Sequence, residues 1–78
     1  MFSEEEKLFL KVMNEESWYD RTKISSVIRV LKLFGIDKYR VERIKSTLTK
    51  ERIIYEVDSE VLAFDSPLFR EFVKNQMD

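Results

Sequence analysis

The chain has 78 residues, of which 44% are hydrophobic, and this is enough apolar material for one folded domain spanning 1–78. A deep enzymatic pocket is not expected, because so short a chain buries only about 60% of the surface that its unfolded form exposes. Histidine and cysteine are absent and glycine occurs once, which excludes disulfides, the common zinc sites, histidine-assisted nucleophiles and a glycine-rich phosphate loop. With a net charge of −1, no long apolar run and no signal-peptide pattern, we expect a soluble, cytoplasmic, non-enzymatic protein that uses no cofactor, metal, membrane or small-molecule substrate.

The first predicted helix runs from about Ser3 to Glu16. Ser3 stands three residues before Glu6, which is the capping-box pattern of a helix start. An apolar stripe follows at helical spacing, formed by Leu8, Phe9, Val12 and Met13. Trp18 and Tyr19 then interrupt the pattern, and we expect both aromatic side chains to pack beneath the connection to the next helix rather than to bind a ligand.

The second predicted helix starts near Asp20 or Thr22, since either side chain can cap a helix. We expect it to be the central helix because its apolar face is wide, consisting of Ile24, Val27, Ile28, Leu31 and Phe34, with Val30 and Leu33 beside them. Gly35 suits the left-handed residue that ends a helix, and Ile36 is expected to turn inward after it.

The third predicted helix, residues 37–50, has two faces of opposite character. Asp37 is its expected N-cap, and one face is apolar through Val41, Ile44 and Leu48. At about 100° per residue, the opposite face carries Tyr39, Arg43, Ser46 and Lys50, flanked by Arg40, Glu42 and Thr47. Such a face suits phosphates and guanine edges in a DNA major groove. A solvated helix surface is the alternative interpretation.

Residues 52–64 change to the pattern of a short β-hairpin, and a fourth helix follows. Runs rich in β-branched and aromatic residues, 52–57 and 61–64, flank a turn at Asp58-Ser59-Glu60 that lacks glycine. Ser66 and Pro67 form a strong helix start. The fourth helix should close the core or meet a partner through an apolar stripe of Leu68, Phe69, Phe72, Val73 and Met77. The predicted fold class is therefore α+β and mostly helical.

Charge is segregated along the chain. Residues 21–52 carry ten lysines and arginines against three acids, whereas residues 1–20 and 53–78 each carry two against six. A polyanionic partner feels the local field over about one Debye length, so this basic centre favours such a partner more than the net charge suggests. The alternative is that the acidic and basic segments face each other within the fold.

The element order resembles a winged helix: three helices, a short hairpin wing and a C-terminal helix. The segment from Arg52 to Val73, with its Asp65-Ser-Pro-Leu-Phe-Arg70 helix start, is similar to the C-terminal winged-helix domain of archaeal ATPases. The resemblance implies that 37–50 is the recognition helix and 52–64 the wing. The acidic wing tip at 58–60 should be repelled by phosphates, which leaves Arg52 as the wing residue expected near DNA.

We therefore expect a DNA-binding module with a role in transcription regulation or replication, whose partner is double-stranded DNA. Arg43 is the expected base contact, because it is central on the exposed face and arginine bonds guanine in bidentate fashion. The expected nucleic-acid contacts are Lys38, Tyr39, Arg40, Arg43, Ser46, Thr47, Lys50, Arg21 and Lys23, with Lys45 as a further phosphate contact.

A protein-interaction or dimerisation domain of the same fold is the competing hypothesis, because a fold does not fix a function. The acidic ends and the acidic wing favour it. A second copy of the chain or a larger protein would then contact the fourth helix through Phe69, Phe72, Val73 and Met77.

Overall fold

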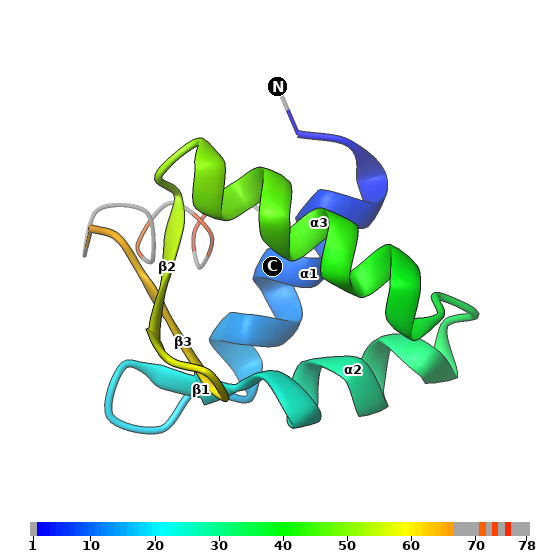
Figure 1. The fold of residues 1–78 in the computed structure, drawn as a ribbon, viewed down its shortest axis with the longest axis horizontal. Helices are drawn as coiled ribbons and strands as arrows, with labels where there is room; N and C mark the ends of the chain where they lie inside the picture. Colours follow the sequence, from blue (N-terminus) through cyan, green and yellow to red (C-terminus); the bar gives the residue numbers. More distant parts are fainter. Residues whose placement is uncertain (1, 67–70, 72, 74, 76–78) are drawn as a thin grey trace.

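The structure of the chain, a computed structural model, describes residues 2–66, 71, 73 and 75. Its elements within residues 2–66 are, in order, α1 (Glu4–Glu15), β1 (Arg21–Lys23), α2 (Ile24–Leu33), α3 (Lys38–Lys50), β2 (Ile54–Asp58) and β3 (Val61–Phe64). Figure 1 shows the antiparallel sheet along one side of the molecule and the three helices on the other. The predicted α+β composition, with helix dominant, is confirmed.

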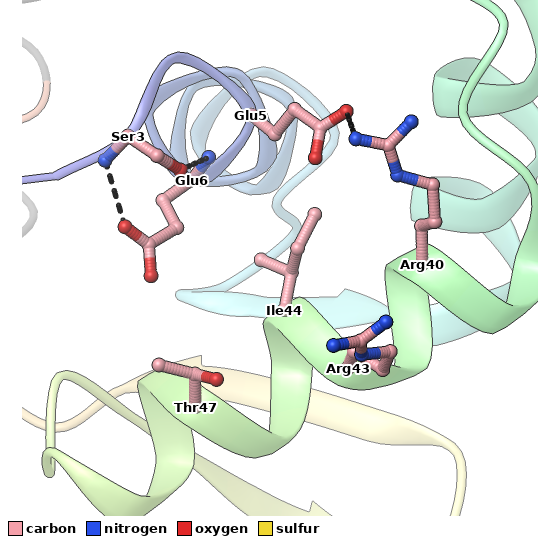
Figure 2. A pocket seen from close by; sticks show the side chains of 7 residues that line it. All are labelled: Ser3, Glu5, Glu6, Arg40, Arg43, Ile44 and Thr47. Atoms are coloured by element: carbon pink, nitrogen blue, oxygen red, sulfur yellow. Dashed lines mark hydrogen bonds and ion pairs between the residues drawn. The ribbon is translucent and has the colours of Figure 1, made fainter.

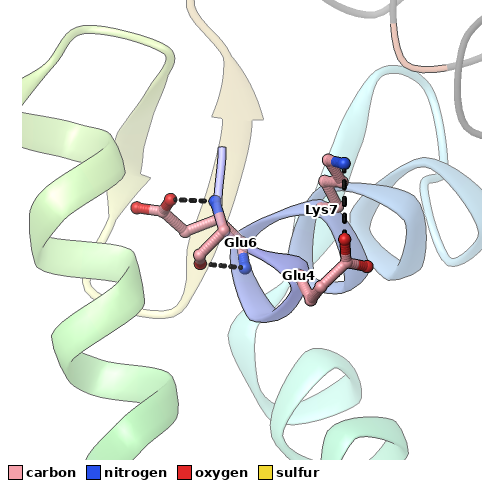
Figure 3. A network of polar contacts seen from close by, with 4 residues as sticks. Glu4, Glu6 and Lys7 are labelled. Atoms are coloured by element: carbon pink, nitrogen blue, oxygen red, sulfur yellow. Dashed lines mark hydrogen bonds and ion pairs between the residues drawn. The ribbon is translucent and has the colours of Figure 1, made fainter. Parts of the chain in front are cut away.

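Helix α1 begins as the capping box predicts. The Ser3 hydroxyl accepts the Glu6 N–H at 3.1 Å, and the Glu6 carboxylate accepts the Ser3 N–H at 2.7 Å (Figure 3). Glu4 pairs with Lys7 on the same turn at 3.5 Å. The helix buries Phe9, Leu10, Val12 and Met13 against the other elements. Its capped first turn fixes where the acidic N-terminal residues lie relative to α3.

A strand that was not predicted, β1, lies between α1 and α2. It pairs with β3 in a sheet of order β1-β3-β2, with Thr22 opposite Leu62. The expectation that Asp20 or Thr22 caps α2 is wrong, because the Thr22 hydroxyl is buried and donates to the Met13 carbonyl at 2.9 Å. Lys23 occupies the N-cap position without a side-chain hydrogen bond. Residues that were expected to start α2 therefore form strand β1 instead, and α2 begins after them at Ile24.

A tight turn at residues 18–21 precedes β1, and we call it the aromatic turn. Trp18 and Tyr19 are 75% and 81% exposed, so the expectation that they pack beneath the connection is wrong. The backbones of Trp18 and Arg21 exchange two hydrogen bonds, and Tyr19 and Asp20 both have positive φ. This geometry points the two rings away from the core.

Helices α2 and α3 end in the same way. After α2, Gly35 has φ +80°, its N–H donates to Lys32 O, and the N–H of Ile36 donates to Leu31 O. These two bonds define a Schellman motif, and Ile36 and Leu31 are both buried beside it. The predicted helix end at Gly35 and the inward turn of Ile36 are confirmed. Asp37 then caps α3 by accepting the Arg40 N–H at 2.9 Å, also as predicted.

The end of α3 repeats this motif without a glycine. Arg52 has φ +61° and donates its N–H to Thr49 O, while the N–H of Ile53 donates to Leu48 O. Ile53 and Leu48 are buried, as Ile36 and Leu31 are at the first motif. An arginine therefore adopts the left-handed conformation that glycine adopts at residue 35.

The hairpin forms where predicted, with β2 and β3 joined at Ser59 and Glu60. A bulge lies between Glu56 and Asp58, and the Asp58 carboxylate accepts the Glu60 N–H at 2.8 Å. This local hydrogen bond to an Asp side chain supports the turn in the absence of glycine. The Glu60 carbonyl accepts the first N–H of α2, from Ile24, at 2.9 Å. The hairpin tip is therefore tied to the start of α2.

The core lies between the helices and the inner face of the sheet. Its buried side chains are Phe9, Leu10, Val12, Met13, Val27, Leu31, Ile36, Val41, Ile44, Leu48, Ile53, Ile54, Leu62 and Val73. Two residues of the predicted α2 stripe depart from it, since Leu33 is 83% and Phe34 62% exposed. They come at the end of the helix, where the chain turns away toward α3. The fourth predicted helix falls mostly outside the described residues, but residues 71, 73 and 75 are helical.

Candidate nucleic-acid interface

Helix α3 presents a continuous polar face to solvent. Val41, Ile44 and Leu48 are buried on its inner side, as predicted. The opposite side chains, which we call the outer face of α3, are all exposed: Tyr39, Arg43, Ser46 and Lys50. The predicted contacts Lys38, Arg40 and Thr47 are exposed as well. The helix of about 20 Å is long enough to follow a major groove about 12 Å wide.

One flank of α3 faces the N-terminal turn of α1 across a hollow of about 330 Å³. Its lining residues are Ser3, Glu5, Glu6, Arg40, Arg43, Ile44 and Thr47. Figure 2 shows Arg40 reaching across this hollow to form an ion pair with Glu5. Arg43 lies on the same helix with no dashed contact to either glutamate. The acidic turn of α1 therefore engages one of the predicted nucleic-acid contacts and leaves its neighbour available.

The other flank of α3 faces β2, where Lys45 is held by two carboxylates. Its ammonium lies 3.2 Å from Glu42 and 3.4 Å from Glu56, and its side chain is 17% exposed. Burial disfavours the charged form, but the hydrogen bonds and charges of the two glutamates outweigh it and raise the pKa of Lys45 above 10.5. Lys45 therefore links α3 to the sheet, and the predicted phosphate contact would have to compete with these two ion pairs.

The acidic ends of the chain thus neutralise part of its basic centre. Besides Arg40 and Lys45, Arg29 of α2 pairs with Glu16 at 3.3 Å. Within the part of the chain that the structure describes, seven cations of residues 21–52 form no ion pair: Arg21, Lys23, Lys32, Lys38, Arg43, Lys50 and Arg52. The alternative that acidic and basic segments face each other therefore holds for three of the ten cations, Arg29, Arg40 and Lys45. The polyanionic partner stays a prediction.

Arg21 and Lys23 do not join the cluster on α3. They lie on β1, which β3 separates from β2 and which Figure 1 shows at the opposite end of the molecule from α3. Their hollow is also a different one, of about 730 Å³ beside the aromatic turn. Both side chains are exposed, but a single duplex in contact with the outer face of α3 does not need to reach them.

Of the predicted protein-interface residues, Phe69, Phe72 and Met77 lie outside the described residues. Val73 is 1% exposed and packs in the core, so its side chain is not available to a partner. The fourth helix was predicted either to close the core or to contact a partner, and Val73 closes the core. Buried Val73 therefore removes one of the four side chains from the predicted surface.

Sequence reasoning missed two features of this surface. The Glu5–Arg40 ion pair joins segments far apart in the chain, and no local pattern indicates it. The aromatic turn lacks the Asn-Gly or Asp-Gly pair that typically indicates a two-residue hairpin turn, so β1 gave no sequence signal either. The three residues of β1 are also too few to show the alternation of a strand.

The described residues contain no group of three potential metal ligands and no helix long and apolar enough to cross a membrane. Comparisons of the chain with protein-family models, with curated proteins and with solved structures found no match. The geometry of α3 and the sheet is therefore what indicates a function.

Proposed function

We propose that this domain is a winged helix-turn-helix that binds double-stranded DNA without catalysing a reaction, with the outer face of α3 in the major groove. The observation that carries the proposal is the row of Tyr39, Arg43, Ser46 and Lys50, all exposed along a helix whose other side is buried. Arginine and lysine in this position recognise phosphates and guanine edges, and Ser46 can donate to either. The proposed role is in transcription or replication.

The arrangement of the elements supports this proposal. Helices α2 and α3 are joined by a short turn at Gly35, as in a helix-turn-helix, and the hairpin β2–β3 follows α3 directly. This order and the three-stranded sheet are consistent with a winged-helix layout. In that layout α3 is the recognition helix.

The hairpin contributes little to DNA binding in this proposal. Its tip is tied to the start of α2 through the Ile24–Glu60 hydrogen bond, and β1 pairs along β3 as far as Val61. The tip also carries the carboxylates of Asp58 and Glu60, which phosphates repel. Arg52, exposed just after α3, is the hairpin-side cation that lies next to the proposed groove contact.

The number of unpaired cations sets the expected salt dependence. Lys38, Arg43, Lys50 and Arg52 lie on α3 or directly after it and form no ion pair among the described residues. Two to four of them on phosphates give a slope of log affinity against log salt of about −2 to −4, at about −0.9 per phosphate. The ion pairs of Arg40 and Lys45 make this slope shallower than the ten cations of residues 21–52 would give.

Fluorescence anisotropy with a labelled duplex of mixed sequence at low salt tests the proposal. We expect saturable binding whose salt slope falls by about 0.9 in Lys50→Ala, which removes one phosphate contact. Lys32→Ala is the matched control, because it removes from α2 an exposed lysine that has no ion pair within the described part of the chain, and it leaves α3 intact. No duplex binding at tens of micromolar protein, or equal losses in the two variants, would refute the proposal.

A protein-interaction role is the second candidate, and a different surface from the predicted one favours it. Leu33 and Phe34 at the end of α2 and Tyr39 at the start of α3 are large apolar or aromatic side chains, each more than half exposed. Such exposure around one turn is typical of a contact surface. Light scattering distinguishes this candidate: a dimer that Phe34→Ser converts to a monomer, without duplex affinity, would support it.

A further inference from the structure

The aromatic turn holds two rings in solvent by means of an unusual backbone. Tyr19 has φ +52° and Asp20 φ +65°, and the Trp18 and Arg21 backbones are hydrogen-bonded at 2.6 and 3.0 Å. Positive φ at both central residues defines a type I′ turn, in which Asn and Gly are preferred and Tyr is not. The Trp18 and Tyr19 rings stand edge to face with centroids 4.7 Å apart. The strained turn thus presents, rather than buries, the aromatic pair.

The strand register places further residues beside this pair. Arg21, Ala63 and Tyr55 lie opposite one another across the three strands and therefore share one face of the sheet. The neighbouring row faces the helices, because Thr22 bonds to α1 and Glu56 pairs with Lys45 of α3. Arg21, Lys23 and Tyr55 consequently lie on the outer face of the sheet, next to the aromatic turn.

Two cations at this surface are available to an anion. Arg21 and Lys23 are exposed and form no ion pair among the described residues. Two carboxylates also line the hollow. Glu16 is paired with Arg29, whereas Asp58 accepts the Glu60 N–H and keeps its negative charge, so phosphates must contact Arg21 and Lys23 on the side away from Asp58. The surface therefore offers two open aromatic faces and two available cations, within a hollow of about 730 Å³.

We propose that the aromatic turn and the adjacent outer face of the sheet bind single-stranded nucleic acid. An unpaired base stacks on Trp18 or Tyr19, and its flanking phosphates contact Arg21 and Lys23. Stacking on aromatic side chains beside a cationic groove is the general means of holding single strands, because every base has a π-face. A duplex does not fit this site, because its internal bases are already stacked on one another. The site is separate from the outer face of α3 and does not depend on duplex binding.

Trp18 is the only tryptophan in the chain, so its intrinsic fluorescence reports directly on this site. We expect oligothymidylate of about eight nucleotides, within the usual range of single-strand sites, to quench Trp18 saturably. A duplex of the same length should not. The salt slope should be about −1.4, because two phosphates each contribute about −0.7 on a single strand.

Matched variants separate this site from α3. Tyr19→Ala should weaken oligothymidylate binding about tenfold through loss of stacking, whereas Tyr39→Ala, which removes an equally exposed tyrosine from α3, should not. The double variant Arg21→Ala/Lys23→Ala should remove the salt dependence, and Lys50→Ala should leave it unchanged. Circular dichroism of each variant confirms that it is folded.

Several results would overturn the proposal. They are absence of quenching by oligothymidylate in the wild-type protein, equal quenching by the duplex, and equal effects of Tyr19→Ala and Tyr39→Ala. A dimer that Tyr19→Ala converts to a monomer, as measured by light scattering, would instead show that a second copy of the chain occupies the aromatic turn. If Lys50→Ala loses duplex binding while oligothymidylate still quenches Trp18, the two sites are separate and both proposals are supported.

Discussion

The two Schellman motifs that end α2 and α3 allow a prediction with opposite signs at equivalent positions. Gly35 and Arg52 occupy the same left-handed position, with φ +80° and +61°. A side chain in this conformation costs about 1–2 kcal/mol, whereas glycine loses about 0.5–1 kcal/mol more backbone freedom on folding. We therefore expect Arg52→Gly to raise the free energy of unfolding by about 0.5–1 kcal/mol.

The reverse substitution should cost a similar amount. A Cβ at Gly35 would meet no atom within 4 Å, so Gly35→Ala adds no steric clash and its effect is purely conformational. We expect Gly35→Ala to lower the free energy of unfolding by about 0.5–1 kcal/mol. For a domain of this size each kcal/mol shifts the melting temperature by about 4–8 °C, so the two variants should differ by about 4–16 °C.

Urea denaturation followed by circular dichroism, with thermal melts in parallel, measures both changes. Glu51→Gly is the matched control, because Glu51 is the exposed neighbour of Arg52 and has φ −83°. Glycine there should destabilise the domain, because it relieves no strain. If Arg52→Gly is no more stable than Glu51→Gly, the left-handed end of α3 is not strained and the reasoning fails.

Three further changes test the polar contacts. Because the Glu5–Arg40 ion pair competes with phosphate, Glu5→Gln should tighten duplex binding by anisotropy about 1.4- to fivefold, which corresponds to the 0.2–1 kcal/mol of an exposed pair. Glu4→Gln changes the net charge identically but removes only the ion pair with Lys7, so equal tightening by this variant would contradict the reasoning. The Thr49 hydroxyl is buried without a hydrogen-bond partner among the residues that the structure describes, so Thr49→Val should raise the free energy of unfolding by about 1 kcal/mol. A loss of stability in urea would show that the hydroxyl is satisfied. The raised pKa of Lys45 contributes stability that is fully present below pH 10.5 and is lost as the pH rises through the folded pKa. The free energy of unfolding should therefore fall more steeply at alkaline pH in the wild type than in Lys45→Gln. Parallel curves for the two proteins would argue against stabilising ion pairs between Lys45 and its two glutamates.

Local signals in the sequence predicted the three helices, the starts of α1 and α3, and the end of α2. The predicted positions are confirmed for the Ser3–Glu6 capping box, for Gly35 after α2 and for Asp37 before α3. These residues depend only on the conformation and hydrogen bonds of backbone groups within a few positions of them, which a local sequence pattern can indicate. The apolar spacing of Val41, Ile44 and Leu48 likewise predicted the buried side of α3, and so the composition of its outer face.

Features that depend on contacts between distant segments were not predictable in the same way. Strand β1 exists because β3 pairs with it, and Thr22 bonds to α1 instead of capping α2. Pairing of Arg40 and Lys45 with acids on other elements likewise changes which cations are available. The composition of the candidate site was therefore readable from the sequence, but its effective charge was not.

The hydrogen bond from Ile24 to the Glu60 carbonyl has a consequence for how the domain folds. Helix α2 has no side-chain cap, so its first turn is completed only when the hairpin, which follows α2 and α3 in the chain, docks on it. An isolated helix of this length is marginal in water. We expect α2 and the hairpin to form cooperatively, with amide hydrogen exchange at Ile24 as slow as in β3. The pair of helices at the centre of the chain is thus not an autonomous unit but is held in place by the sheet.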